Sequence, residues 1–324
     1  MKLLITIDTE EDNWNRYSPT VNPVCNIKGI ERLQKIFDKF SVKPTYLITY
    51  PVANTTDSIN ILKPIMEKGN CEIGAHCHPW NTPPLNDLEP VNKTDTMICN
   101  LPENMIYKKI ALLHQTIKKN FGIAPTSFRT GRYGFSKEVA QTLVKLKYKV
   151  DSSITPYTNW NHKHGPDFSN KTPHFFWYGS NGKKIYRIGK LLEVPVSVGF
   201  LQSNFDLRNR FLKFAEQDIF KRIHLVGLLD YLNIVSKAWL SPEIESLDTM
   251  IKLSKQLRKN KFNCLNLTFH SSSLVEGLSP FTTTRKDVER LLEKISDFIS
   301  FERRNGIESQ TLSEFADEKQ KSTR

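Results

Sequence analysis

Lys2-Leu-Leu-Ile-Thr-Ile-Asp8 forms a short apolar run that ends at a carboxylate. The run contains several β-branched residues and does not alternate with polar ones, which is typical of a strand buried on both faces of a parallel sheet. Downstream of it, residues 29–40 carry apolar side chains at helical spacing, and residues 43–49 have the composition of a second strand. Strand, helix and strand in this order predict a βαβ unit.

The same alternation continues to the end of the chain, and it favours an α/β fold with a parallel sheet. We expect further strands over 71–76, 126–129, 149–153, 191–197, 263–269 and 307–310, and helices over 59–68, 103–121, 136–147, 242–259, 284–304 and 313–316. Residues 156–240 are less regular. We interpret them as an elaborated insertion within one domain that covers 1–317, followed by a polar tail over 318–324 that frays.

Composition narrows the class of protein. The 324 residues are 39% hydrophobic and 25% charged, enough to bury one large core. No run approaches the roughly 18 apolar residues of a membrane span, and the opening apolar run is too short for a signal peptide, so we expect a cytoplasmic protein without an integral membrane segment. Five widely spaced cysteines fit reduced thiols. The net charge of +12 is scattered, so nucleic-acid binding is not expected.

Polar side chains follow the apolar part of four predicted strands. Because the carboxyl ends of parallel strands meet at one edge of the sheet, these side chains should converge on one pocket. They are Asp8 and Glu10 after the first strand, His76 and His78 after the third, Arg129 after the fourth, and His270 near the end of the chain.

Two of these groups have the i, i+2 spacing that places side chains on one face of an extended chain. They are Asp8-Thr-Glu10 and His76-Cys-His78. Two imidazoles with a carboxylate form an open metal site that suits Zn²⁺ best, with Mn²⁺, Co²⁺ or Ni²⁺ also fitting. Either Asp8 or Glu10 can be the carboxylate ligand, and Cys77 should point into the core. The rival pair in His162-Lys-His164 lies among turn formers, which favours a loop.

Five motifs spread over most of the chain contain these residues. They are Thr6-Ile-Asp8-Thr-Glu10, Glu72-Ile-Gly-Ala-His76-Cys-His78-Pro-Trp80, Phe128-Arg129-Thr-Gly-Arg132-Tyr133-Gly134, Asp151-Ser-Ser-Ile154 and Leu267-Thr-Phe-His270-Ser-Ser-Ser273. In this order they resemble the motifs of the polysaccharide deacetylases, the NodB-homology group, and more narrowly of its WalW-like branch. The resemblance implies a distorted, incomplete (β/α)7-type barrel and a divalent metal that serves to remove the N-acetyl group of an amino sugar.

The resemblance also implies a role for each residue. Glu10, His76 and His78 would hold the metal, Asp8 would be the catalytic base, Arg129 would orient Asp8, His270 would be the general acid, and the backbone N–H of Tyr133 would help to hold the oxyanion. The sequence departs from the family in two places. Thr9 stands where the family commonly has a second Asp, and the histidine spacing is H-x-H rather than H-x-x-x-H, with Trp80 where the second imidazole would fall.

Aromatic residues near these motifs could bind a sugar ring or simply pack at the barrel rim. They are Trp80, Tyr133, Tyr157 and Trp160. Arg132, in the same region, could bind a phosphate or a carboxylate of the substrate, or it could hold a carboxylate at the barrel rim. We therefore expect a carbohydrate substrate, a surface glycan or a precursor with a nucleotide or lipid carrier. Two alternatives stay open: a deformylase or other C–N amide hydrolase, and a catalytically inactive sugar-binding module.

Overall fold

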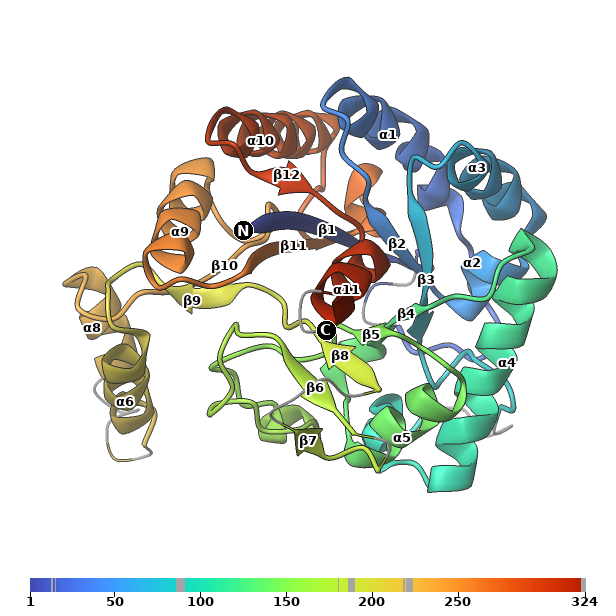
Figure 1. Ribbon diagram of the computed structural model, residues 1–324, viewed down its shortest axis with the longest axis horizontal. Helices are drawn as coiled ribbons and strands as arrows, with labels where there is room; N and C mark the ends of the chain where they lie inside the picture. The colour runs from blue at the N-terminus through green and yellow to red at the C-terminus, as the bar shows by residue number, and fades with distance from the viewer. Residues whose placement is uncertain are drawn as a thin grey trace.

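Seven parallel strands curl into an incomplete barrel at the centre of the molecule (Figure 1). The computed structural model describes residues 1–12, 14, 16–85, 91–179, 181–185, 190–217, 219 and 224–321. The strands run in the order β11 (Cys264–His270), β1 (Lys2–Thr9), β2 (Thr45–Ile48), β3 (Glu72–Cys77), β4 (Ser127–Thr130), β5 (Val150–Asp151) and β8 (Leu191–Glu193). This confirms the predicted α/β class and barrel type.

No strand ladder among the described residues joins β8 to β11, so the barrel is closed there by single contacts. The side-chain amide of Asn266 in β11 donates to the carbonyls of Val194 and Pro195, at 3.3 and 3.2 Å, and to the Ser152 hydroxyl at 2.9 Å. The hydroxyl of Ser197 accepts the backbone N–H of Asn266 at 2.9 Å. A buried polar residue therefore closes the gap, because its amide finds partners where the backbone ladder ends.

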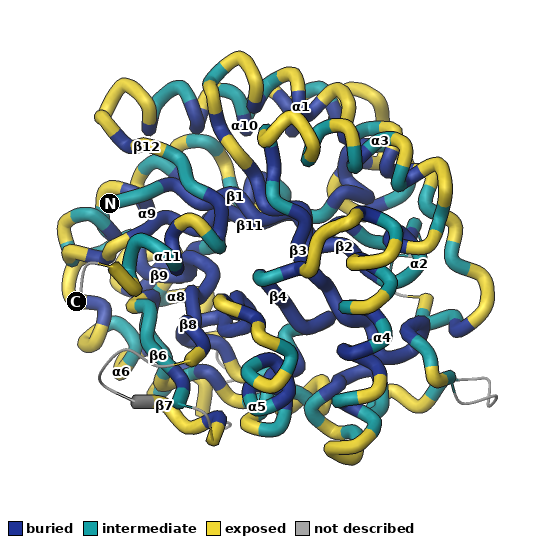
Figure 2. Tube along the Cα trace, turned by 45° about the vertical axis from the view of Figure 1, so that its right-hand side comes forward, coloured by how far each residue is buried: buried dark blue, intermediate teal, exposed yellow. Residues whose placement is uncertain are grey.

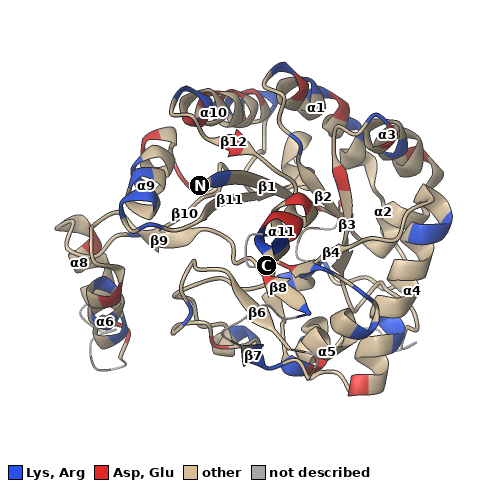
Figure 3. Ribbon diagram, viewed as in Figure 1, with Lys and Arg blue, Asp and Glu red and all other residues tan. Residues whose placement is uncertain are grey.

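Helices cover the outside of the barrel, and their apolar faces pack on the buried strands (Figure 2). They are α1 (Ile30–Lys39), α2 (Tyr50–Asn54), α3 (Thr56–Glu67), α4 (Glu103–Phe121), α5 (Lys137–Lys145), α9 (Leu247–Lys259) and α10 (Arg285–Arg304). Short 3-10 helices are η1 (Cys25–Gly29), η2 (Thr94–Thr96), η3 (Ile98–Asn100), η4 (Gly131–Tyr133), η5 (Asn161–Lys163) and η6 (Ser271–Leu274). None of the described helices has the length and apolar character needed to cross a membrane. Lys and Arg are spread over these helices together with Asp and Glu (Figure 3).

The irregular region of the sequence adds a hairpin on β8, and a two-stranded sheet and two helices on the side of α9 (Figure 1). β6 (Phe176–Tyr178) and β7 (Lys184–Ile185) form an antiparallel hairpin on β8. β9 (Val198–Phe200) pairs antiparallel with β10 (Lys237–Trp239). Between these two strands the chain forms α6 (Phe205–Ala215) and α8 (Leu225–Tyr231), which project from the body of the molecule (Figure 1).

The last short strand is present as expected, but the helix after it is longer than predicted and extends into the expected polar tail. β12 (Glu308–Ser309) pairs with β1, and α11 (Leu312–Lys321) continues well past residue 318. The reason is packing: Leu312, Phe315 and Ala316 are buried against the core side chains of Leu4, Leu47 and Val150. The helix lies over the end of the barrel at which β1 begins (Figure 1). Residues 322–324 lie outside the described residues.

Candidate metal and catalytic site

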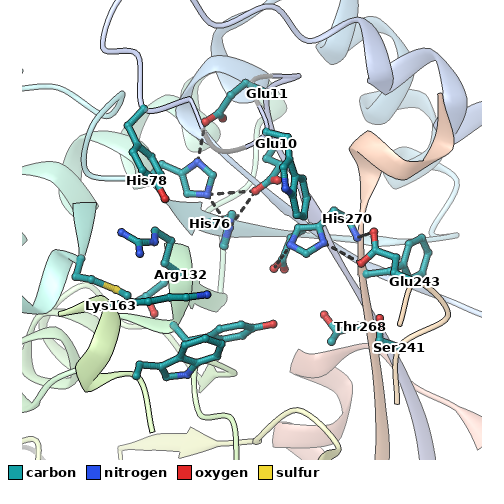
Figure 4. Close-up of a pocket in the computed structure, with 18 of the residues that line it drawn as sticks. Glu10, Glu11, His76, His78, Arg132, Lys163, Ser241, Glu243, Thr268 and His270 are labelled. Atoms are coloured by element: carbon teal, nitrogen blue, oxygen red, sulfur yellow. Dashed lines mark hydrogen bonds and ion pairs between the residues drawn. The ribbon is translucent and has the colours of Figure 1, made fainter. Parts of the chain in front are cut away.

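A cavity of about 860 Å³ lies where the parallel strands end, and the predicted site residues other than Arg129 line it (Figure 4). The strand register brings them together. Asp8 in β1 is the direct partner of His270 in β11, and His76 in β3 is the partner of Arg129 in β4. Residues far apart in the sequence thus meet because neighbouring strands end at the same level.

Glu10, His76 and His78 form a cluster whose potential ligand atoms all lie within 4.8 Å of one another. The Glu10 carboxylate oxygen lies 3.2 Å from Nε2 of His78 and 3.7 Å from Nε2 of His76. Both imidazoles are buried, with 2% and 5% of their residue surface exposed. Asp8 is not part of this cluster. The geometry favours Glu10 over Asp8 as the carboxylate that accompanies the two histidines.

The Nδ1 atom of each of these two imidazoles lies within hydrogen-bond distance of an oxygen acceptor. Nδ1 of His76 lies 3.1 Å from the carbonyl of Arg129, and Nδ1 of His78 lies 2.8 Å from the Glu11 carboxylate. With both Nδ1 atoms donating, both Nε2 atoms present lone pairs to each other at 3.0 Å. Lone pairs at this distance repel, so the arrangement requires a proton or a metal ion beside the two Nε2 atoms. The donor set therefore fits a divalent ion.

Glu11 was not predicted from the sequence, although it directly follows Glu10. Its side chain is buried, and with Glu10 it opposes the effect of burial on His78, so that the pKa of His78 rises to about 10. Trp80 was predicted to bind substrate, but its indole is buried and stacks on His78 with ring centroids 4.1 Å apart. Trp80 lines the cavity and also fixes the plane of the imidazole.

Asp8 is held by Arg129, whose side chain is completely buried. Burial works to raise the pKa of Asp8, but the Arg129 guanidinium and the imidazoles of His76 and His270 outweigh it and hold the pKa below its usual value. The guanidinium donates to the Asp8 carboxylate at 2.6 Å. Its other donors reach Thr6, Ser152 and Thr268. All five N–H groups of Arg129 are therefore used, and the orientation of Asp8 is fixed.

His270 lies on the other side of Asp8, with Nε2 3.9 Å from the Asp8 carboxylate. Its Nδ1 lies 2.9 Å from the carboxylate of Glu243, which also accepts the His270 backbone N–H at 3.1 Å and the Ser273 hydroxyl. Burial works to lower the pKa of His270, but Glu243 together with Glu10 and Asp8 raises it to about 10. Glu243 was not predicted as a site residue, because it falls within the helix predicted over 242–259, whereas α9 begins only at Leu247.

The remaining predicted residues line a second wall of the cavity. The rings of Tyr133 and Trp160 stack with centroids 5.9 Å apart, and Arg132 lies over the ring of Tyr17. Arg132 and Tyr133 both have positive φ angles, 53° and 59°, which non-glycine residues adopt at an energetic cost. The backbone after β4 is thus bent sharply into the cavity.

Three further predictions have clear outcomes. Tyr157 is buried and packs on Phe200 and Phe205, so the structure does not place it at the cavity. His162 and His164 lie on the exposed loop around η5, as expected, and contribute to the cavity rim. Cys77 is buried in the core and points away from the two histidines, also as expected.

Comparison with known proteins shows similarity of fold. No protein-family model matches the sequence, and no curated protein matches it. A protein from Mycobacterium smegmatis, provisionally described as a polysaccharide deacetylase, has 14% sequence identity and a TM-score of 0.55 over 98% of this chain and 89% of its own. A protein from Parabacteroides distasonis, provisionally described as a glycoside hydrolase/deacetylase, has 10% identity and a TM-score of 0.57 over 98% and 70%.

The 4-alpha-glucanotransferase from Thermococcus litoralis is also similar, with 11% identity and a TM-score of 0.52 over 98% of this chain and 40% of its own. The fold alone therefore does not decide the reaction. What the comparisons establish is that this chain has the curled, parallel-stranded β/α barrel found in a protein described as a polysaccharide deacetylase and in one described as a glycoside hydrolase/deacetylase.

Proposed function

We propose that the protein is a metal-dependent hydrolase that removes the N-acetyl group from an amino sugar of a surface glycan or its precursor. We assign it to the polysaccharide deacetylases, with the WalW-like branch as the narrower assignment. One observation carries the proposal: the cluster of Glu10, His76 and His78 lies in the same cavity as the Asp8–Arg129 and His270–Glu243 pairs.

The metal would be held by Glu10 and by Nε2 of His76 and His78, with Zn²⁺ the most suitable ion and Mn²⁺, Co²⁺ or Ni²⁺ as substitutes. When bound, such an ion supplies a Lewis acid for the amide carbonyl and lowers the pKa of water. The protein's own contribution is to place an acceptor at each Nδ1, so that both Nε2 atoms are directed at the ion and the Nε2 proton is the one displaced when the ion binds.

Asp8 is assigned as the general base. Its carboxylate stays ionised because Arg129 stabilises the charge, and the free oxygen Oδ2 faces His270 in the cavity. A water molecule near Oδ2 would pass its proton to Asp8 as the water oxygen attacks the amide carbonyl. Arg129 cannot move away during this step, since all its donors are already engaged.

His270 is assigned as the general acid. Its raised pKa keeps the imidazole protonated near neutral pH, and Glu243 fixes Nδ1 so that the Nε2 proton points into the cavity. Donation of this proton to the amide nitrogen allows the C–N bond to break with a neutral amine as leaving group. The backbone N–H of Tyr133 is assigned to the oxyanion. The rings of Trp160 and Tyr133 offer a flat apolar surface for a sugar ring.

Metal analysis paired with acetate release from N-acetylglucosamine oligomers tests the proposal. We expect the purified protein to contain about one divalent ion, and His76→Ala or His78→Ala to lose both the ion and acetate release. Lys286→Gln, a change on the exposed surface of α10, is the control and should retain both.

Other outcomes would point to the two alternatives. Release of formate rather than acetate from matched N-acyl sugars would indicate the deformylase. Glycan binding without metal at any pH near neutrality would indicate an inactive sugar-binding module, and the hydrolase would have to be given up.

A further inference from the structure

The wall of the cavity that lies across from His270 and Glu243 carries cationic side chains (Figure 4). Three cavity residues form what we call the cationic wall: Lys93, Arg132 and Lys163. They come from three different segments, the residue before η2, the η4 turn after β4, and the η5 loop. The fold thus gathers three positive charges from separate parts of the chain at one side of the same cavity.

These charges have no counterion within the part of the chain that the structure describes. The cavity carboxylates contact other groups: Asp8 contacts Arg129, Glu10 and Glu11 share His78, and Glu243 contacts His270. No described carboxylate lies within ion-pair distance of the cationic wall. Among the described residues, the three charges of the cationic wall therefore face the cavity without a carboxylate partner.

Neighbouring side chains hold two of the cations in place. Arg132 donates to the Thr96 hydroxyl, and its guanidinium carbon lies 5.2 Å from the centre of the Tyr17 ring. The Lys163 ammonium lies 5.2 Å from the centre of the Trp160 ring. Such contacts restrict long side chains that would otherwise extend into solvent, so less conformational entropy is lost when a ligand binds.

The loops that carry the cationic wall are also tied to each other. The side-chain amide of Asn100 donates to the carbonyl of Thr94 at 2.9 Å and to the carbonyl of His164 at 2.8 Å. The segments around η2 and η5 are therefore linked through one residue. This linkage and the hydrogen bond from Arg132 to Thr96 connect the three segments of the cationic wall, so the fold fixes their relative positions.

We propose that the cationic wall binds an oxyanion of the substrate, a phosphate or a carboxylate attached to the N-acetylated sugar or to its neighbour. This rests on the proposed function, since it takes the sugar to lie in the same cavity. The planar guanidinium of Arg132 suits two parallel hydrogen bonds to an oxyanion, and the two ammonium groups add point charges. Neutral chitin-like oligomers would leave the three charges unpaired.

Calorimetric binding to the full, metal-loaded chain tests this. The probes are N-acetylglucosamine 1-phosphate and a disaccharide of glucuronic acid and N-acetylglucosamine, compared with the neutral N-acetylglucosamine dimer. We expect a charged probe to bind more tightly than the neutral one. Arg132→Gln and Lys163→Gln should each weaken its binding by about tenfold or more, and added salt should weaken it too. Lys286→Gln is the matched control and should bind like the wild type.

The phosphate and the carboxylate are told apart by which charged probe binds more tightly. The metal itself could capture a phosphate, so His76→Ala is measured as well. If the wall is the site, His76→Ala still binds the charged probe. If His76→Ala loses this binding and Lys163→Gln binds like the wild type, the proposal is overturned. Equal affinity for charged and neutral probes also overturns it.

The outcome separates this inference from the proposed function. Acetate release from neutral oligomers with no preference for a charged probe would leave the hydrolase standing and remove the cationic wall as a subsite. Tight, salt-sensitive binding of a charged probe that depends on Lys163, without acetate release from any N-acetyl sugar, would support the wall and contradict the hydrolase.

Discussion

His270 is the side chain whose assigned role is easiest to separate from that of its neighbours, because it is not part of the metal cluster. We expect His270→Ala to retain metal and to lose turnover by roughly 10²- to 10⁴-fold, the usual contribution of a general acid. Metal content and acetate release measured on the same sample check this. A variant that comes out without metal would show that the division of roles between His270 and the ligands is wrong.

Glu243 sets the protonation of His270, so it should control the alkaline side of the pH profile. The acid must be protonated to act, and activity is lost as the pH rises through the pKa of His270, which is raised to about 10. Glu243→Gln removes the largest contribution that raises this pKa. The alkaline limb of kcat/KM should therefore move to lower pH, while Glu276→Gln, an exposed change six residues after His270, leaves it in place. An unmoved limb in Glu243→Gln would assign that limb to another group.

The turn η4 after β4 approaches β3 so closely that only glycine fits at its first position. A Cβ on Gly131 would lie 2.4 Å from the His78 ring and 2.9 Å from the carbonyl of Cys77. Gly131→Ala should therefore displace His78 and lower metal affinity, because a displacement of about 1 Å is large compared with metal–ligand tolerances. Gly227→Ala in α8 meets no atom within 4 Å and is the control. Metal titration checks both variants.

Helices and strands with a clear pattern of apolar residues could be predicted from the sequence, and so could the polar residues at the strand ends. β1, β11, α4 and α10 differ from their predicted bounds by no more than one residue at either end. In contrast, α9 begins at Leu247 and not at residue 242, and the helix α2 was not predicted at all. Burial and side-chain bonds decide these boundaries: Ser246 caps α9 by accepting the backbone N–H of Thr249 at 3.1 Å.

The supporting residues of the site could not be predicted in the same way. Glu11 and Glu243 act through His78 and His270, and each of these contacts joins residues that are distant in the sequence, 67 and 27 positions apart. Strand periodicity reports which residues end a strand, but not which loop side chains fold back over them. The expectation for Trp80 was incomplete for the same reason, since its stacking on His78 depends on the loop after β3.

Arg129 connects several strands across the barrel, so its removal should lower the stability of the whole protein. Its guanidinium bonds to residues of β1 and β11 and to Ser152 next to β5, while its backbone belongs to β4. Arg129→Met would remove the main counterion of the buried Asp8 carboxylate and leave its other buried partners unsatisfied, so the free energy of unfolding should fall by about 3–5 kcal/mol. Arg32→Met, which breaks an exposed pair with Glu289, should cost about 1 kcal/mol or less. Urea unfolding of the two variants compares them, and equal losses would contradict the assigned importance of Arg129.

The pairing of β1 with β11 has a consequence for biosynthesis. The backbone N–H of Glu10 donates to the hydroxyl of Ser271 at 3.1 Å, across 261 positions of the chain. A ribosome releases these partners at very different times, so β1 can pair early with β2, but its other neighbour, β11, exists only after most of the chain has been made. Contacts between such distant segments slow folding. The pair of Asp8 and His270 can thus form only after most of the chain has been made, whereas Glu10, His76 and His78 all belong to its first 78 residues.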